Sequence, residues 1–489
     1  MFSVDVPRGA DGQPLLPEDI WQGLHPAAQV VVVALAQVAQ RVVTLEAEVR
    51  ELKARLGQNS TNSSRPPSHD PPQAPRRSVA PTGRPPGGQP GHVAHQRAVV
   101  SPERVDRIID HRPTRCGQCA RALPVGSLAG LGDDFVAHQV TEVPPLRSEV
   151  TEHRLHRVRC PACGAQTRAA LPLGVPRGAF GPRLQATVAV LSGRYRLSRR
   201  EVADVCETVL DAPLGVGSVD GLCQATADAL ATPVAEVAAT LPATPLANAD
   251  ETRWRQAGQT RWLWTVVTPL ATVFVIASSR DSRIIKGLLG EAFAGILGSD
   301  RWSAYGWLDV ALRQICWAHL KRDFQALVDR GGAAGPVGVA ALALIHDLFA
   351  TWHQFRDGAF DRAALQARLQ PVQGAFGRVL DDGARCPDAK AAGLCRALDR
   401  LWPALWTFLE VDGVDPTNNA AERALRPAVL WRKGSLGTQS DGGARFVERM
   451  LTVVATCKQH SRSVLDYLTT VCIAAQLGQP VPSLLPVTA

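Results

Sequence analysis

Several features of exported and membrane proteins are missing from this sequence. No uninterrupted apolar run reaches the roughly 20 residues that a transmembrane helix needs, so we expect no membrane partner. The opening residues, Met-Phe-Ser-Val-Asp-Val-Pro, lack the basic and apolar regions of a signal peptide. The 11 cysteines are an odd number, which argues against a disulfide framework in a chain without export signals. These absences predict a cytoplasmic protein.

Lysine is also scarce, and arginine supplies most of the positive charge. The net charge of +8 and the pI of about 9.1 favour an anionic partner without identifying it. Arginine suits bidentate phosphate contacts, although a GC-rich genome would produce the same bias. The 489 residues leave room for about two to four domains with a sizeable core.

After an N-terminal tail (1–27), residues 28–56 carry a heptad pattern whose first and fourth positions are filled by valine and leucine. This combination favours a parallel two-stranded coiled coil, so we expect a homo-oligomer. The alternative is an amphipathic helix packed on its own domain. The two seam rows are Leu35, Val42, Val49 and Leu56, and Val31, Val38, Leu45 and Leu52.

Residues 57–100 are rich in asparagine, serine, proline and glycine, with scattered arginines. Such a segment cannot bury enough apolar area to fold alone, so we expect a disordered basic linker. The linker could lie along a phosphate backbone or serve as a solvated tether.

Two CxxC pairs, Cys116/Cys119 and Cys160/Cys163, fall within residues 101–175. Paired CxxC knuckles in a reducing compartment predict a closed, tetrahedral and structural Cys₄ zinc site of the zinc-ribbon type. The gap between the pairs is longer than usual, and a β-hairpin including residues 154–159 could fill it. Four unrelated thiols are the alternative.

Residues 181–240 are predicted to be helical. Ser198 and Glu201 form a capping box, and a break at 212–217 precedes a second helix capped by Ser218. Helix, short turn and helix predict a helix-turn-helix-like DNA-binding region, in which Arg199 and Arg200 would contact the backbone. A plain helical hairpin is the alternative.

Residues 245–325 change to strands. Three β-rich runs (245–250, 261–268 and 272–279) precede a helix (281–291), a strand ending before Asp300 and a strand at 312–317. This order predicts an α/β fold with an RNase H-like mixed sheet. In that fold the strands before Asp300 and around Asp250 are neighbours, so both carboxylates can reach the same metal ions.

The remaining chain is predicted to be helical. Residues 326–415 form a helical insertion, residues 416–440 complete the core, and residues 441–489 form C-terminal helices. Thr417 would cap a helix that places Asn418, Glu422 and Arg426 on one face. Arg423, Arg432 and Lys433 extend its basic surface.

Three carboxylates then carry the predicted chemistry. Asp250 and Asp300 each end an apolar run, and Glu422 lies on the last helix of the core. Brought together, they would repel one another unless divalent cations neutralised them. Two Mg²⁺ or Mn²⁺ ions about 3.5–4 Å apart are the usual agents for cutting and joining phosphodiesters.

The sequence resembles DDE transposases of the bacterial insertion sequence 66 family over about residues 30–460. Besides the heptads and CxxC pairs, the matching segments are Gly87–His92, Asn248–Thr252, Gly298–Tyr305, Cys316–Phe324 and Asn418–Arg423. The resemblance implies that Asp250, Asp300 and Glu422 are the catalytic triad. It also implies binding to terminal inverted repeats and target DNA, strand cleavage and transfer, residence at the nucleoid and, for many relatives, small accessory proteins.

The resemblance is incomplete in one respect. Some DDE transposases have a DNA-positioning lysine after the catalytic glutamate, and Val429 occupies that position here. His319 is interpreted as an active-site neighbour, although Cys316 and His319 could also be half a zinc site. Glu251 is the acid most easily mistaken for Asp250. Two alternatives remain: a zinc-dependent DNA-binding regulator with an inactive nuclease-like core, and a nuclease or resolvase that cuts without joining.

Overall fold

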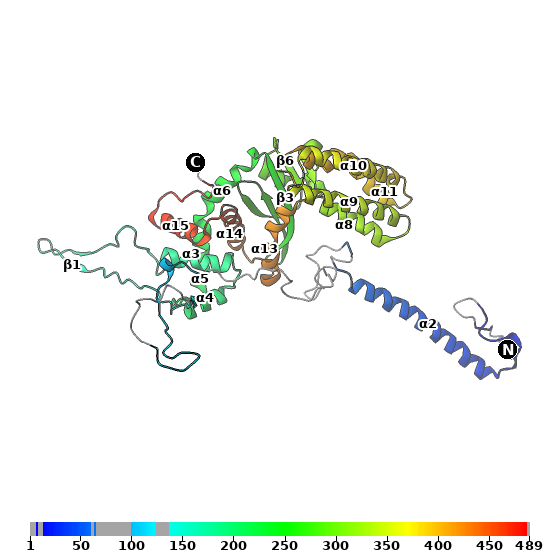
Figure 1. Cartoon of the computed structure of the whole chain (residues 1–489), viewed down its shortest axis with the longest axis horizontal. Helices are drawn as coiled ribbons and strands as arrows, with labels where there is room; N and C mark the ends of the chain where they lie inside the picture. Colours follow the sequence, from blue (N-terminus) through cyan, green and yellow to red (C-terminus); the bar gives the residue numbers. More distant parts are fainter. Residues whose placement is uncertain (1–5, 8–12, 60–62, 65–98, 124–135, 487–489) are drawn as a thin grey trace. The chain divides into compact units, whose positions relative to one another are not determined.

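The computed structural model describes residues 6–7, 13–59, 63–64, 99–123 and 136–486 (Figure 1). Contacts divide the chain into two units. The first comprises Met1–Arg77, Ala170–Arg199 and Gly217–Ala489, and the second comprises Ser78–Ala169 and Arg200–Val216. Most of the linker predicted at 57–100 lies outside the described residues, as does the 87–92 tract.

A five-stranded mixed sheet lies at the centre of the first unit. Its strands are β3 (Leu246–Gln256), β4 (Gln259–Val267), β5 (Thr272–Ala277), β6 (Ile296–Ser299) and β7 (Arg313–Ile315). Their order is β5-β4-β3-β6-β7. The first three are antiparallel, whereas β3, β6 and β7 are parallel. Helix α7 (Ser282–Leu289) connects β5 to β6. The predicted α/β class and the predicted adjacency of β3 and β6 are confirmed.

Strand β3 extends beyond the predicted run 245–250, so Asp250 lies in the middle of the strand and is not its last residue. Beyond Asp250, β3 continues as one arm of a hairpin with β4, paired as far as Gln256↔Gln259. The turn residues Ala257 and Gly258 have φ of 48° and 76°, a left-handed pair that matches the twist of a two-residue hairpin. The parallel pairing with β6 nevertheless stops at Asn248↔Gly298. Asp250 therefore follows the end of the parallel part of the sheet.

Helix α14 (Asp441–Gln459) covers the outer edge of the sheet. Three of its side chains, one helical turn apart, accept hydrogen bonds from alternate backbone N–H groups of β5. This arrangement satisfies an edge that would otherwise be open to pairing. The pairs are Thr272 with Thr456 (3.1 Å), Phe274 with Thr452 (3.1 Å) and Ile276 with Glu448 (2.5 Å). Helix α15 (Val464–Leu477) follows.

The predicted helical insertion is helical. It contains α8 (Trp317–Arg330), α9 (Ala334–Arg356), α10 (Arg362–Ala384), α11 (Ala389–Arg400) and α12 (Trp402–Glu410). The aromatic rings of Trp317, Phe376 and Trp406 pack together, with centroids of the Trp317 pairs 5.0 Å apart. Helix α13 (Asn419–Ser435) then returns to the sheet and packs against β3.

The expectation that no segment is long and apolar enough to span a membrane needs correction. Two helical segments, Pro26–Lys53 and Ala334–Arg356, meet that test by length and composition. The sequence expectation counted uninterrupted apolar runs, whereas mean hydropathy tolerates interruptions. Core helices of soluble proteins also pass this test, and α9 contributes Ala341, Ile345 and Leu348 to the buried helical core.

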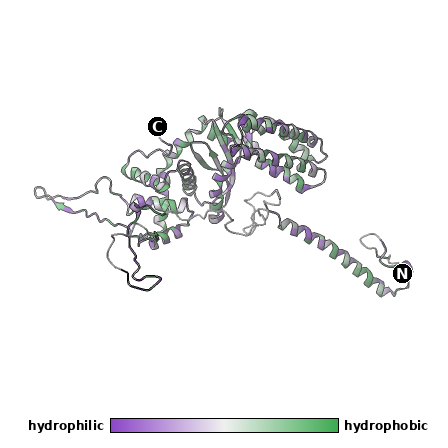
Figure 2. Cartoon of the chain, viewed as in Figure 1, coloured by the Kyte–Doolittle hydropathy of each residue, from purple (hydrophilic) through white to green (hydrophobic). Residues whose placement is uncertain are grey.

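The N-terminal heptads form one helix, α2 (Pro26–Leu56), after a short helix α1 (Glu18–Gly23). Apolar and polar residues alternate along it (Figure 2). The predicted seam is exposed: Leu35 is 62% accessible and Val38 60%. The helix is confirmed, whereas its pairing with a second copy stays a prediction.

The hairpin near the CxxC pairs differs in position from its prediction. Strand β1 (Arg157–Arg159) pairs antiparallel with β2 (Gln166–Arg168). The hairpin therefore encloses the second CxxC pair instead of filling the gap between the two pairs. Both strands are only three residues long, and all their side chains are exposed.

The four predicted zinc ligands do not form the closed site that the sequence predicts. Cys119 and Cys163, the second thiol of each pair, are exposed, whereas Cys116 and Cys160 are half-buried. All four thiols are free, and among the described residues they form no group of metal-ligand atoms within 4.8 Å. The single apolar side chain of the two hairpin strands, Val158, is itself 67% exposed. The closed geometry is therefore not confirmed, and Zn²⁺ binding by these residues stays a prediction.

Four helices occupy the predicted helical region: α3 (Pro182–Gly193), α4 (Arg199–Thr208), α5 (Val216–Ala229) and α6 (Ala231–Ala239). Helix α5 begins at Val216, before the predicted cap, so Ser218 lies inside it and is not its cap. The boundary between the two units falls at the starts of α4 and α5, and the helix-turn-helix stays a prediction.

Candidate active site

Neighbouring acids on β3 have different surroundings. Residues of β3 alternate between partly exposed and buried along the strand. Asp250 is partly exposed, whereas Glu251 is buried. Glu251 accepts hydrogen bonds from Arg280 (2.6 Å) and from the Tyr305 hydroxyl (2.5 Å). Arg280 in turn lies over the Trp302 ring, 4.1 Å from its centroid. Glu251 is therefore fully engaged inside the protein, which leaves Asp250 as the available carboxylate of this strand.

Asp300 lies directly after β6, as predicted. Its Oδ1 accepts a hydrogen bond of 2.9 Å from the backbone N–H of Trp302, which fixes the carboxylate at the start of the following turn. Burial raises its pKa, while that hydrogen bond and the charge of Arg280 act in the opposite direction. Close approach of β6 to β3 requires Gly298, because a Cβ there would lie 2.5 Å from the Asn248 side-chain oxygen.

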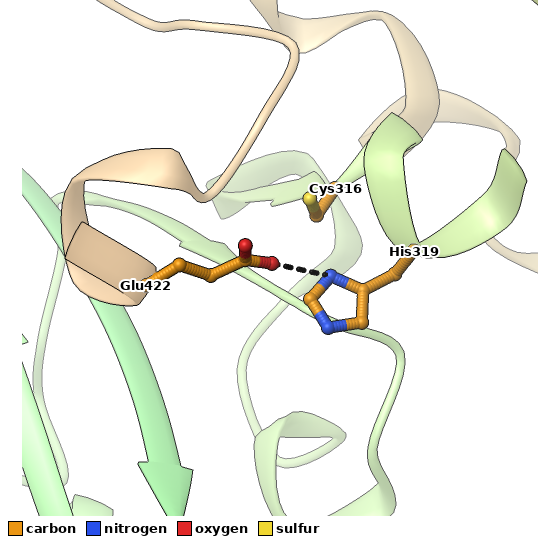
Figure 3. Close-up of side chains that lie close together, drawn as sticks. All are labelled: Cys316, His319 and Glu422. Carbon is orange, nitrogen blue, oxygen red and sulfur yellow. Dashed lines mark ion pairs between the residues drawn. The ribbon is translucent and has the colours of Figure 1, made fainter. Parts of the chain in front are cut away.

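Glu422 lies in the first turn of α13 and faces α8. Its Oε1 is 3.5 Å from His319 Nδ1 (Figure 3) and 3.5 Å from the Arg322 guanidinium. Burial raises the pKa of Glu422, while Arg322 and Arg423 oppose the rise. Burial, assisted by Arg322, lowers the pKa of His319 to about 3, so the imidazole is neutral and the His319–Glu422 contact is not an ion pair.

The three predicted carboxylates influence one another across three elements. Burial raises the pKa of Asp250 well above its usual value, and the charges of Glu251, Asp300 and Glu422 raise it further. Their oxygens do not form a group within 4.8 Å in the part of the chain that the structure describes. Carboxylate oxygens that oppose one another's ionisation are hard donors, and they fit Mg²⁺ or Mn²⁺.

Asn418 is the N-cap residue of α13, and Thr417 is not the cap that the sequence predicts. The Asn418 side chain is 1% exposed, and its amide donates a hydrogen bond of 2.7 Å to the Ala249 carbonyl. The side-chain NH₂ group donates to the strand, and the side-chain oxygen does not accept a hydrogen bond from the free N–H groups of the first turn. In the structure Asn418 therefore contacts β3, and its role as a DNA contact stays a prediction.

The predicted basic residues fall into two groups. Arg432 donates hydrogen bonds to Thr252 Oγ1 and to the Arg253 carbonyl, and Arg199 pairs with Asp220 at 3.0 Å. These guanidinium groups are engaged within the protein, so their role as DNA contacts stays a prediction. The side chains exposed to solvent are those of Arg200, Arg423, Arg426 and Lys433.

The two CxxC pairs belong to the second unit of the chain, whereas the three carboxylates belong to the first. Within each pair the second cysteine contacts the thiol of the first. The backbone N–H of Cys119 lowers the pKa of Cys116, and that of Cys163 lowers the pKa of Cys160 in the same way. Each pair therefore has the local geometry of a knuckle that favours thiolate at its first cysteine.

Sequence reasoning missed Arg322 as part of the site, whereas it named Cys316 only as half of an alternative zinc site with His319. Arg322 lies three residues after His319, one helical turn along α8, so the spacing itself places both on one face. Cys316 is buried at the start of α8, where its Sγ accepts a hydrogen bond of 3.1 Å from the backbone N–H of Asn418. No comparable spacing in the sequence indicated that Tyr305 and Arg280 bind Glu251.

Comparisons with known proteins match parts of this chain to two families and to two uncharacterized proteins. Residues 177–446 match the family described as "Transposase IS66 family". Residues 18–98 match a second family, of unknown function. An uncharacterized protein of Sinorhizobium fredii, y4hP, is 27% identical over 395 residues, which cover 72% of this chain and 69% of that protein. A second, y4qI, is 28% identical over 205 residues, covering 38% of this chain and 37% of its own length.

Proposed function

Since the matched residues make up more than half of it, the chain belongs to the IS66 transposase family, and we propose that it is a DDE transposase. It would bind the terminal inverted repeats of its element, cleave a DNA strand at the element's end and join the freed 3′-OH to target DNA. Asp250, Asp300 and Glu422 would be the catalytic residues.

The observation that carries this proposal is the mutual effect of the three carboxylates. Asp300 and Glu422 both raise the pKa of Asp250, although the three residues come from the end of β6, the start of α13 and the middle of β3. A folded protein retains such repulsion at a cost, and perturbed acids of this kind cluster at functional sites. The sheet order, with three antiparallel strands followed by two parallel ones, supports an RNase H-like core.

In this proposal the protein's own residues align the reacting groups and neutralise the charge of the DNA phosphates. The three carboxylates would hold Mg²⁺ or Mn²⁺, which when bound supplies an activated water and stabilises the entering and leaving oxygens of phosphoryl transfer. Tyr305 and Arg280 keep Glu251 paired, so Glu251 does not compete for the ions. The exposed guanidinium groups of Arg423 and Arg426 would neutralise DNA phosphates close to the site.

The test uses labelled DNA carrying the element's terminal repeat and flanking sequence, with and without Mg²⁺. We expect metal-dependent nicking at the repeat boundary by the wild type, followed by strand transfer when target DNA is added. Asp250→Asn, Asp300→Asn and Glu422→Gln should each bind the repeat normally and fail to nick it. Asp381→Asn is the matched control, because Asp381 is an exposed acid of α10.

Three outcomes would contradict the proposal. Nicking by any of the three variants at the wild-type rate would exclude that residue from catalysis. Specific repeat binding without nicking by the wild type, even with the element's accessory proteins, would favour a DNA-binding regulator with an inactive core. Nicking without strand transfer would instead indicate a nuclease or resolvase.

The remaining parts of the chain have proposed roles in DNA binding. The two CxxC pairs would hold a structural Zn²⁺, with the exposed Cys119 and Cys163 drawn inward to join Cys116 and Cys160. Helices α4 and α5 would contact the terminal repeat. A chelator that removes Zn²⁺ should then weaken repeat binding, and unchanged affinity would exclude the zinc site from recognition. With DNA as its substrate, the protein would act in the cytoplasm at the nucleoid.

A further inference from the structure

A second cluster of metal-ligating side chains adjoins the carboxylates. Cys316 Sγ, His319 and Glu422 each offer one ligand atom, and these atoms all lie within 4.8 Å of one another. Cys316 and His319 come from the start of α8, and Glu422 reaches toward them from α13 (Figure 3). No other group of three such side chains meets this criterion among the described residues.

The cluster contains two buried polar atoms that make no hydrogen bond to any described residue, one of which, Glu422 Oε1, also lies 3.5 Å from the Arg322 guanidinium. His319 Nδ1 and Glu422 Oε1 are both buried and lack a hydrogen-bond partner within the described part of the chain. Buried polar atoms in a native structure are usually satisfied, so two facing orphans 3.5 Å apart call for a ligand between or beside them. An imidazole nitrogen and a carboxylate oxygen are both ligand types that Zn²⁺ accepts in proteins.

The donor types select the ion. Mg²⁺ prefers oxygen ligands, whereas a thiol and an imidazole together suit Zn²⁺. Three protein ligands of Cys, His and Glu type resemble an open zinc site whose fourth position is left to water. In tetrahedral Zn²⁺ coordination, ligand atoms are roughly 3.3–3.8 Å apart, so a small inward movement from the present spacing would complete the set.

We propose that Cys316, His319 and Glu422 form a Zn²⁺ site that inhibits the enzyme by withdrawing Glu422 from the Asp250 and Asp300 carboxylates. The inhibitory part rests on the proposed function, because it requires Glu422 to be catalytic. On binding, the Cys316 thiol releases its proton to solvent and the thiolate coordinates the ion. Arg322, which also approaches Glu422 Oε1, would turn away as the ion takes its place.

The first experiment measures binding without DNA. Co²⁺ is titrated into the metal-free full-length protein, and the thiolate-to-cobalt absorption and the bound equivalents are recorded. Because the CxxC pairs also bind Co²⁺, the comparison is between variants. Cys316→Ser should bind one equivalent fewer than the wild type, and Glu422→Gln should change the absorption. Cys395→Ser, which removes a buried thiol of α11 outside the cluster, should match the wild type.

The second experiment adds Zn²⁺ to Mg²⁺-supported nicking of terminal-repeat DNA. Zn²⁺ should inhibit the wild type at a concentration about 10-fold or more below that needed for Cys316→Ser. Equal Co²⁺ stoichiometry and spectra in wild type and Cys316→Ser would exclude the proposed metal site. Equal Zn²⁺ sensitivity would overturn the inhibition. Absence of nicking by the wild type would count against the proposed function and leave the stoichiometry as an independent result.

Discussion

Asn418 donates its side-chain amide to the backbone carbonyl of Ala249, 2.7 Å away, and so joins the start of α13 to the residue before Asp250. The same residue donates its backbone N–H to Cys316 Sγ at the start of α8. One buried asparagine thus links the strand that carries Asp250, the helix that carries Glu422 and the helix that carries His319. We therefore expect it to position these elements around the proposed site.

Replacing Asn418 with alanine should therefore affect both stability and geometry. Loss of the amide leaves the buried Ala249 carbonyl with one bond fewer, at a cost of about 1–3 kcal/mol in the free energy of unfolding. Nicking should fall more than repeat binding, because Glu422 loses its link to the strand. Asn419→Ala, one residue later in the same helix, is the control for denaturant unfolding and nicking assays. Equal behaviour of the two variants would contradict the positioning role.

Neutralising the adjacent acids Asp250 and Glu251 should change the free energy of unfolding in different directions. Glu251→Ala removes the acceptor for Arg280 and Tyr305, and we expect a loss of about 1.5–3 kcal/mol in unfolding free energy. Asp250→Asn removes a charge repelled by Asp300 and Glu422, so the metal-free protein should keep or gain stability while losing nicking. Thermal unfolding in a chelating buffer distinguishes them. A destabilised Asp250→Asn variant would show that Asp250 is a structural residue.

The pH dependence of stability follows from the raised pKa of Asp250. A carboxyl whose pKa is higher in the folded state binds more protons when folded than when unfolded. Its ionisation therefore lowers stability as pH rises from its unfolded pKa, about 4, through its folded pKa. Between about pH 5 and 8, the metal-free wild type should lose thermal stability relative to Asp250→Asn. Mg²⁺ should remove this difference, and a difference that is constant with pH would contradict the raised pKa.

Much of the sheet could be predicted from the sequence because its strands carry strong local signals. The β-rich runs that became β4 and β5 are bounded by turns, and the apolar run before Asp300 became β6. The end of β3 was not predictable in the same way. Its continuation past Asp250 depends on pairing with β4, and the exposed Arg253 and Arg255 of that arm resemble a loop in composition.

The site shows the same division between local and long-range information. Helical spacing correctly placed Asn418 and Glu422 near the start of one helix. The same spacing could have indicated that Arg322 lies on one helix face with His319. Spacing could not show that Asn418 points to Ala249, 169 residues earlier, instead of toward DNA. Nor could it show that Cys316 lies beside Asn418, because that contact depends on how the helical insertion returns the chain to the sheet.

The CxxC pairs show the same limit. Their spacing correctly indicated two local knuckles, in which Cys119 and Cys163 lower the pKa of Cys116 and Cys160. The spacing could not show whether the two knuckles meet, because 40 intervening residues separate them and their approach depends on contacts beyond either pair. The exposure of Cys119 and Cys163 is a property of that long-range arrangement.

The last prediction concerns the exposed apolar seam of α2. Val42 and Leu45 are 47% and 42% accessible, and heptads of this type favour pairing with a second copy of the chain. Replacing both with aspartate should convert a dimer to a monomer in analytical ultracentrifugation, because two charges per helix cannot be buried in the seam. The control replaces Gln40 and Ala47, which lie opposite the seam, with aspartate and should stay dimeric. A wild type that sediments as a monomer would exclude the coiled coil, and recovery of the protein with membranes would favour an interfacial role for this helix instead.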